Sequence, residues 1–181
     1  GYLKPDPGLV SMFRERLKEF GPGPYVGVSW RSSLQGAFRS EYYSMVEEMR
    51  PVLKVEGVTY VNLQYDVKPE ELAVVKSDFG IDLAAWDDTD LKMELDKAAA
   101  LTSCMDLVLS PSTSVAVMAG ALGTETIEFR PFPVPGTYFK NGRCPWFPSV
   151  RFFTKRQSEK WSKLFRRIAV EIEALKTASV L

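Results

Sequence analysis

The stretch at residues 106–123, DLVLSPSTSVAVMAGALG, constrains the fold more than any other part of the chain. Asp106–Leu109 predicts a short buried strand, because an apolar run ends at a turn signal. Ser112 or Thr113 is a suitable N-cap for the helix that follows, and Gly123 is placed to end it. Such a helix N-terminus offers free N–H groups to an anion such as a diphosphate. The alternative is an ordinary turn whose hydroxyls only cap the helix.

Strands and helices alternate along the rest of the chain as well. Residue spacing predicts strands at 25–29, 58–63, 81–83, 106–109, 125–129 and 150–153, and helices at 8–20, 41–49, 68–78, 90–103, 114–122 and 161–175. This order predicts an α/β fold, a three-layer Rossmann-like open parallel sheet of about six strands with helices on both faces. Ligands bind such sheets at the carboxyl ends of the strands.

Composition excludes several classes of function. The 23 basic and 23 acidic residues balance, so no net charge attracts nucleic acid or an acidic membrane. No apolar run approaches the roughly 20 residues of a membrane span, and no signal peptide is visible. The absence of histidine, and two cysteines without ligand spacing, exclude a structural zinc site, a Ser-His-Asp triad and a Cys-His pair. We therefore expect a cytoplasmic protein without a metal.

The length of 181 residues predicts one domain over 1–181. Residues 1–7 contain two prolines and are expected to form a linker. We expect the domain to be a C-terminal fragment of a larger protein.

Several segments, in their order and spacing, resemble a bacterial glycosyltransferase module. They are YLKPDP at 2–7, VGVSWR at 26–31, RS at 39–40, GV at 57–58, LQY at 63–65, LD at 95–96, DLVLS at 106–110, AGALG at 119–123 and PWFPSVR at 145–151. The resemblance is to the C-terminal half of glycosyltransferases that follow tetratricopeptide repeats. These enzymes are related to heptosyltransferases and more distantly to O-GlcNAc transferase.

The resemblance implies one lobe of a two-lobed GT-B enzyme, the lobe that binds the nucleotide-sugar donor. The implied partners are the nucleotide sugar, an N-terminal GT-B lobe and tetratricopeptide repeats in the full-length chain. No other cofactor is implied, and the catalytic base often lies in the other lobe. The chain departs from the family at Ser112, usually Asp, and at Val117, usually His, and its expected acidic pair is reduced to Asp96 followed by Lys97.

The predicted phosphate contacts follow two strands. Ser112, Thr113 and Ser114 would donate hydroxyl and backbone hydrogen bonds to the diphosphate. Arg31 and Arg39 follow the first strand and could clamp a phosphate with two hydrogen bonds each. The alternative for both arginines is a solvated surface position beside a local carboxylate.

Other candidates would contact the remainder of the donor. Gln64 could bond a phosphate or sugar hydroxyl, or instead satisfy loop backbone. Asp96 could accept from ribose hydroxyls, or be an ordinary exposed acid. Trp86 could stack on the base, and Trp146 could cover the sugar or the interlobe cleft, although aromatic side chains more often pack. The acids at 87, 88 and 90 could hold a cation, but complementing the next helix is the preferred interpretation.

Three hypotheses for function follow. The first is glycosyl transfer from a nucleotide sugar, with this lobe holding the diphosphate and stabilising the leaving group without a metal. The second is a degenerate, non-catalytic module that binds a partner or scaffolds repeats, which Ser112 and Val117 motivate. The third is another nucleotide-binding Rossmann-like protein, although no Gly-x-Gly-x-x-Gly follows the first strand.

Overall fold

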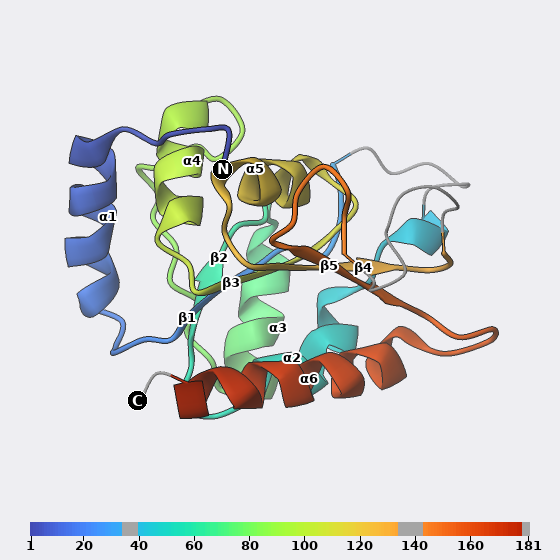
Figure 1. Cartoon of the computed structure of the whole chain (residues 1–181). Coiled ribbons are helices and arrows are strands. Elements are labelled where there is room, and N and C mark those ends of the chain that lie inside the picture. Colours follow the sequence, from blue (N-terminus) through green and yellow to red (C-terminus); the bar gives the residue numbers. More distant parts are fainter. Residues whose placement is uncertain (34–39, 134–142, 179–181) are drawn as a thin grey trace.

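The chain folds into a parallel β-sheet covered by helices on both faces (Figure 1), as seen in a computed structural model that describes residues 1–33, 40–133 and 143–178. The elements are α1 (Pro7–Lys18), β1 (Tyr25–Val28), η1 (Ser40–Tyr42), η2 (Val46–Met49), α2 (Arg50–Leu53), β2 (Thr59–Asn62), α3 (Pro69–Phe79), α4 (Leu95–Ser103), β3 (Leu107–Pro111), α5 (Ser114–Leu122), β4 (Thr126–Arg130), β5 (Val150–Thr154) and α6 (Trp161–Ala178). The predicted three-layer α/β class is confirmed.

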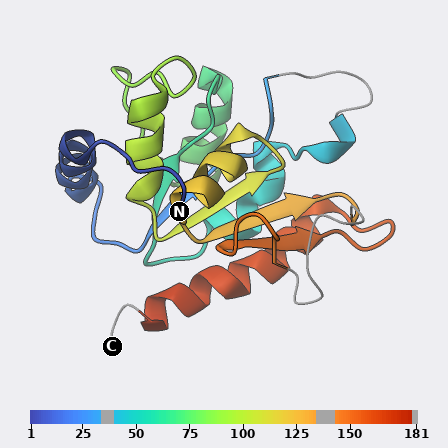
Figure 2. The same cartoon turned by 45° about the horizontal axis from the view of Figure 1, so that its top comes forward.

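The sheet has the strand order β2-β1-β3-β4-β5, and every pair is parallel (Figure 2). The chain passes from β1 outward to β2 and then returns past β1 to β3. The topological switch point therefore lies between the carboxyl ends of β1 and β3, where ligands of such folds bind.

The sheet has five strands, so the prediction of a strand at 81–83 is wrong. Only Ala84 joins the sheet, through a single parallel bridge to Val61. Asp82 is exposed and forms an ion pair with Lys76. The segment therefore buries too little to continue as a strand.

Two apolar layers hold the helices to the sheet. Helices α1, α4 and α5 cover one face, and η2, α2, α3 and α6 cover the other (Figures 1 and 2). Both faces of the inner strands β1, β3 and β4 are thus buried, which explains why β1 and β3 read as largely apolar runs rather than as alternating ones. Among the described helices, none is long and apolar enough to cross a membrane.

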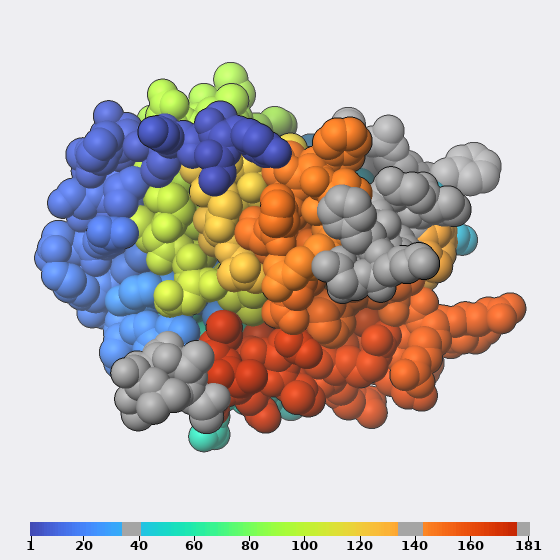
Figure 3. All heavy atoms as spheres, in the orientation of Figure 1, coloured from blue at the N-terminus to red at the C-terminus, as the bar shows by residue number. Residues whose placement is uncertain are grey.

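The N-terminal segment, predicted as a linker, lies across α5 (Figure 3). The backbone N–H groups of Tyr2 and Leu3 both donate to the carbonyl of Ala121, at the C-terminal end of α5. The Tyr2 hydroxyl donates to the carbonyl of Trp146, and its ring lies 6.0 Å from that of Phe147. The segment before β5 and the N-terminal segment therefore brace the same end of α5.

Gly120 is the point of closest approach in this contact. A Cβ atom there would lie 2.7 Å from Cγ of Phe147 and 2.8 Å from Cγ2 of Val150. Glycine to alanine ordinarily stabilises a helix interior by about 1 kcal/mol. We expect Gly120→Ala to destabilise the protein instead and to lower the free energy of unfolding by about 1–3 kcal/mol, because the added methyl group overpacks the contact with Phe147 and Val150.

Urea denaturation measures this change, and the double variant Gly120→Ala/Phe147→Ala tests its cause. If overpacking is responsible, the double variant loses less stability than the sum of the two single variants. Additive losses would contradict the steric explanation.

Candidate functional site

The turn from β3 into α5 leaves the helix N-terminus without a side-chain cap. Thr113 is the N-cap residue, but its side chain makes no capping hydrogen bond. Its hydroxyl instead lies 3.1 Å from Oγ of Ser110, which also donates to the carbonyl of Pro111. The first turn of α5 holds no acidic residue. Thr113 therefore occupies the N-cap position as predicted, but its hydroxyl does not cap the helix, and no acidic side chain in the first turn offsets the positive end of the helix dipole.

A cavity of about 170 Å³, here called the Ser114 cavity, opens beside this turn between α4 and α5. Its lining residues are Leu63, Tyr65, Leu91, Lys92, Leu95, Ala98, Thr102, Ser114, Val115 and Met118. Aliphatic side chains thus form most of the wall, while Lys92 and the α5 N-terminus supply positive potential. Such a cavity suits a ligand that joins a flat or apolar group to an anionic one.

A second cavity of about 210 Å³, here called the Trp86 cavity, adjoins the first and shares Tyr65 and Leu91 with it. Trp86 lines it but also packs toward α1, with ring centroids 5.7 Å from Phe13 and 5.5 Å from Phe20. Packing thus explains much of the position of Trp86.

Sequence reasoning missed Glu128 and Arg130, which lie beside the Ser112 turn. Glu128 is buried in β4, accepts a hydrogen bond from the Ser112 hydroxyl and accepts a second one, 2.6 Å long, from Nε of Arg130. The Arg130 guanidinium stacks 3.8 Å from the ring centroid of Phe152. The sequence did carry a signal for Glu128, because an acidic residue is disfavoured in a strand and is therefore unusual inside a buried one.

Arg31 lies in a buried ion pair rather than at the surface. Its Nε and Nη2 atoms donate to the two carboxylate oxygens of Glu71, at 2.7 and 2.6 Å, and Nη2 also donates to the carbonyl of Asp66. The local carboxylate was one predicted alternative, although burial replaces the expected solvation. Arg31 could bind phosphate as predicted only through Nη1 or by exchanging Glu71 for it.

Hydrogen bonding sets the pKa of both partners. The hydrogen bond to Glu71 raises the pKa of Arg31 further above its usual range. Burial alone would raise the pKa of Glu71, but hydrogen bonds from Arg31, Trp30 and the backbone of Lys68 together lower it.

Gln64 satisfies loop backbone, the second of its two predicted roles. Its Oε1 atom accepts from the N–H groups of Trp30 and Arg31, at 3.1 and 3.0 Å, and from the hydroxyl of Ser29. Its Nε2 atom donates to the carbonyl of Tyr65. With 1% of its surface exposed, it joins the ends of β1 and β2.

The other candidates lie apart from the turn. Asp96 is exposed on the first turn of α4, whose residues Leu95 and Ala98 line the Ser114 cavity. Trp146 is 71% exposed and is bonded to Tyr2 at the C-terminal end of α5, about 13 Å of helix away from Ser114. The structure does not bring it to the turn.

Arg39 lies outside the described residues. Two of the three acids predicted as a possible cation site have protein partners: Asp88 pairs with Arg16, and Asp90 accepts from the N–H groups of Lys92 and Met93.

The Glu71 ion pair generates a pH-dependent prediction. Because the pKa of Glu71 is lower in the folded state, its stabilisation is present above the usual pKa of 4.5 and is lost as the pH falls through the folded value. We expect Glu71→Gln to lower the free energy of unfolding at pH 7 by about 3–5 kcal/mol, because it leaves Arg31 buried without its counter-charge. The difference from wild type should shrink below pH 4.5.

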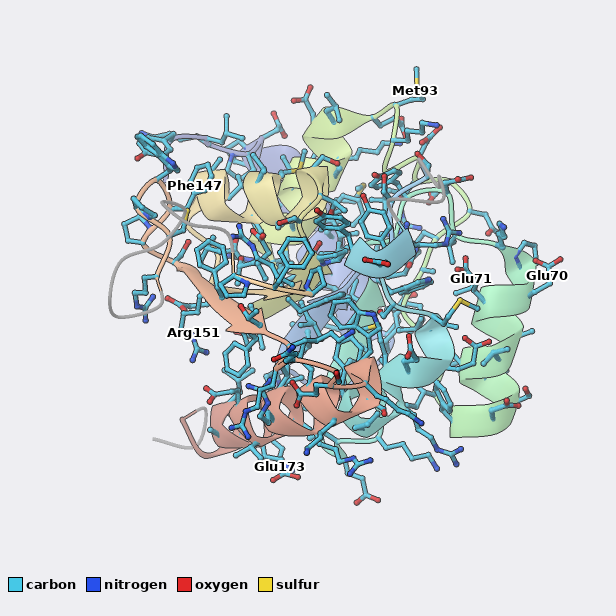
Figure 4. The ribbon with its side chains drawn as sticks, turned by 90° about the vertical axis from the view of Figure 1, so that its right-hand side faces the viewer. Glu70, Glu71, Met93, Phe147, Arg151 and Glu173 are labelled. Atoms are coloured by element: carbon cyan, nitrogen blue, oxygen red, sulfur yellow. The ribbon has the colours of Figure 1, made fainter. Side chains whose placement is uncertain are left out.

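Urea denaturation at several pH values measures this difference. Glu70→Gln is the matched control, since Glu70 is exposed on the same turn and points away from the pair (Figure 4). It should change stability by less than about 0.5 kcal/mol. A loss for Glu71→Gln that is the same at every pH would contradict the assignment.

The comparison with sequences relates the chain to part of a longer protein. No protein-family model matches it. Protein FlbA of Caulobacter vibrioides is 36% identical over 175 residues, which make up 94% of this chain and 28% of FlbA. The chain thus spans less than a third of the length of that relative.

The comparison with solved structures relates the fold to glycosyltransferases. The family 9 glycosyl transferase of Veillonella parvula matches with a TM-score of 0.72 at 12% identity, over 97% of this chain and 54% of that one. E. coli ADP-heptose LPS heptosyltransferase II matches with a TM-score of 0.65 at 17% identity, over 99% of this chain and 54% of that one. E. coli heptosyltransferase WaaC, solved with ADP-2-deoxy-2-fluoro heptose, matches with a TM-score of 0.55 at 15% identity, over 92% of this chain and 48% of that one. The chain therefore has a glycosyltransferase-like fold related to that of heptosyltransferases, and it spans about half of each solved chain.

Proposed function

We propose that the chain is the nucleotide-sugar-binding lobe of a glycosyltransferase. The observation that carries the proposal is the uncapped first turn of α5, which opens onto the Ser114 cavity next to the switch point between β1 and β3. The likeness of the fold to half of a family 9 glycosyltransferase supports it.

In this proposal the diphosphate accepts hydrogen bonds from the backbone N–H groups in the first turn of α5 and from the hydroxyl of Ser114. The Ser112 hydroxyl has one proton, which it donates to Glu128, so it could join them only by leaving Glu128. Lys92 adds positive charge, and the base and ribose occupy the aliphatic part of the Ser114 cavity. Donors fixed in place before reaction stabilise a departing diphosphate without a metal, so the nucleotide sugar is the substrate and no further cofactor is needed.

The remaining parts of the enzyme would lie elsewhere in a longer protein. We propose an N-terminal GT-B lobe that supplies the acceptor site and the catalytic base, together with tetratricopeptide repeats, in a cytoplasmic protein. The relative FlbA, of which this chain spans 28%, is long enough to hold such additional parts.

Glu128 favours a second candidate, a degenerate module that binds without catalysis. Its buried carboxylate holds the Ser112 hydroxyl and thereby puts negative charge beside the proposed diphosphate. Arg130 compensates part of this charge through its hydrogen bond. The balance between the two side chains decides how well the turn accepts an anion.

Calorimetric titration with UDP, GDP, ADP and CMP tests the proposed site. We expect one nucleotide to bind saturably, and Ser114→Glu to weaken binding more than tenfold, because the new carboxylate takes the place of the phosphate. The same change should keep or raise the melting temperature, since an acid in the first turn stabilises a helix.

Ser114→Gln is the matched control, of equal size but uncharged, and should lose less affinity than Ser114→Glu. Equal nucleotide affinity of the two variants would show that the nucleotide does not bind at the N-terminus of α5. No binding of any of the four nucleotides would favour the degenerate module.

Removing the charge of Glu128 tests whether this carboxylate opposes the binding of an anion at the turn. Glu128→Gln retains an acceptor for Ser112 and should tighten binding of a nucleoside diphosphate about three- to tenfold, the effect of relieving charge repulsion close to the protein surface. Binding of the uncharged nucleoside should not change in the same titration. Unchanged diphosphate affinity would show that Glu128 does not face the ligand.

A further inference from the structure

A separate cavity of about 270 Å³, here called the Ser44 cavity, lies between η2 and α3. Its lining residues are Arg31, Ser44, Met45, Val46, Glu47, Lys68, Glu70, Glu71 and Val74. Val46 and Val74 belong to the apolar layer that includes α6, whereas the Ser114 cavity lies in the layer of α4 and α5. The two cavities are therefore on opposite faces of the sheet.

The floor of this cavity holds a hydroxyl that lacks a partner. Ser44 is 5% exposed, and its Oγ atom is buried without a hydrogen bond. Its backbone N–H donates to the carbonyl of Trp30, which fixes the residue at the end of β1. Buried polar atoms nearly always have a partner in the protein, in a ligand or in ordered water. The Ser44 hydroxyl thus indicates a group that binds in the cavity.

Arg31 also lines this cavity and carries a further hydrogen-bond donor. Its Nε and Nη2 atoms are engaged by Glu71 and by the carbonyl of Asp66. Within the described ranges this leaves Nη1 as the guanidinium nitrogen with no hydrogen bond. Ser44 and Arg31 together therefore suit an oxygen atom that accepts hydrogen bonds.

The charges around the cavity disfavour an anionic ligand. Glu47, Glu70 and Glu71 provide three negative charges, and Arg31 and Lys68 provide two positive ones, so the lining is negative by one charge. A phosphate or carboxylate would meet net repulsion there. Figure 4 shows Glu71 on the inner side of α3 and Glu70 on the outer side.

The remaining wall is apolar and comes from Met45, Val46 and Val74. Sugars and polyols combine hydroxyls that donate to carboxylates and accept from Ser44 with C–H groups that pack on such a wall. We infer that the Ser44 cavity is a second binding site, for a neutral sugar or polyol. At about 270 Å³ it is slightly smaller than a cavity for a drug-sized ligand, which fits one sugar unit.

Titration of the ¹⁵N-labelled chain with glucose, N-acetylglucosamine and myo-inositol, followed by NMR, tests this inference. We expect saturable shifts for at least one of these compounds in residues around the cavity. Ser44→Ala should weaken the binding about three- to tenfold, because it removes one hydrogen bond to the ligand. Glucose 6-phosphate should bind more weakly than glucose.

Ser149→Ala is the matched control, because Ser149 also has a buried hydroxyl without a partner but does not line the cavity. Both alanine variants should fold and be at least as stable as wild type, and only Ser44→Ala should weaken sugar binding. No sugar binding by wild type, equal binding by both variants, or preferred binding of glucose 6-phosphate would each overturn the inference.

Such a sugar could be free or part of a nucleotide sugar, and a second comparison distinguishes these sources. If Ser44→Ala weakens binding of a nucleotide sugar but not of its nucleotide, the sugar belongs to the donor. If Ser44→Ala weakens only the binding of the free sugar, the cavity binds an acceptor or a separate ligand. The inference does not rest on the proposed function, because the monosaccharide titration is read without any nucleotide.

Discussion

The carboxamide of Gln64 is the constraint on which the carboxyl edge of the sheet depends. One oxygen atom accepts three donors from the segment that leaves β1, namely the hydroxyl of Ser29 and the N–H groups of Trp30 and Arg31. This geometry directs the Arg31 side chain toward α3, where Glu71 binds it. The loops after β1 and β2 and the start of α3 are thus fixed as one unit, and fixed loops let a site bind without first ordering itself.

This unit contributes lining residues to two cavities on opposite faces of the sheet. Tyr65, adjacent to Gln64, lines the Ser114 cavity, while Arg31 lines the Ser44 cavity. A change in the Gln64 hydrogen bonds would therefore affect both. On the β4 side, Glu128 and Arg130 set the charge beside the Ser112 turn independently of that unit.

The sequence predicted the fold well because local signals agreed with the packing. The apolar strands, the Thr113 N-cap position and Gly123 at the end of α5 all lie where expected. The roles of charged side chains were harder to predict, because they depend on partners far apart in the chain. Arg31 and Glu71 are 40 residues apart, and Ser112 and Glu128 are 16 apart. The position of Trp146 likewise depends on a distant residue, because its backbone carbonyl accepts a hydrogen bond from the Tyr2 hydroxyl, which no local pattern encodes.

Helix α5 is held by other segments at its C-terminal end but lacks a side-chain cap at its N-terminal end. The N-terminal segment holds its C-terminal end through Ala121, whereas its first turn lacks both a side-chain cap and an acidic residue. An anion bound at that turn would satisfy the same N–H groups that a capping side chain satisfies in other helices. Ligand occupancy and the integrity of α5 would then be two measures of one equilibrium, and a bound diphosphate would act as part of the folded structure itself.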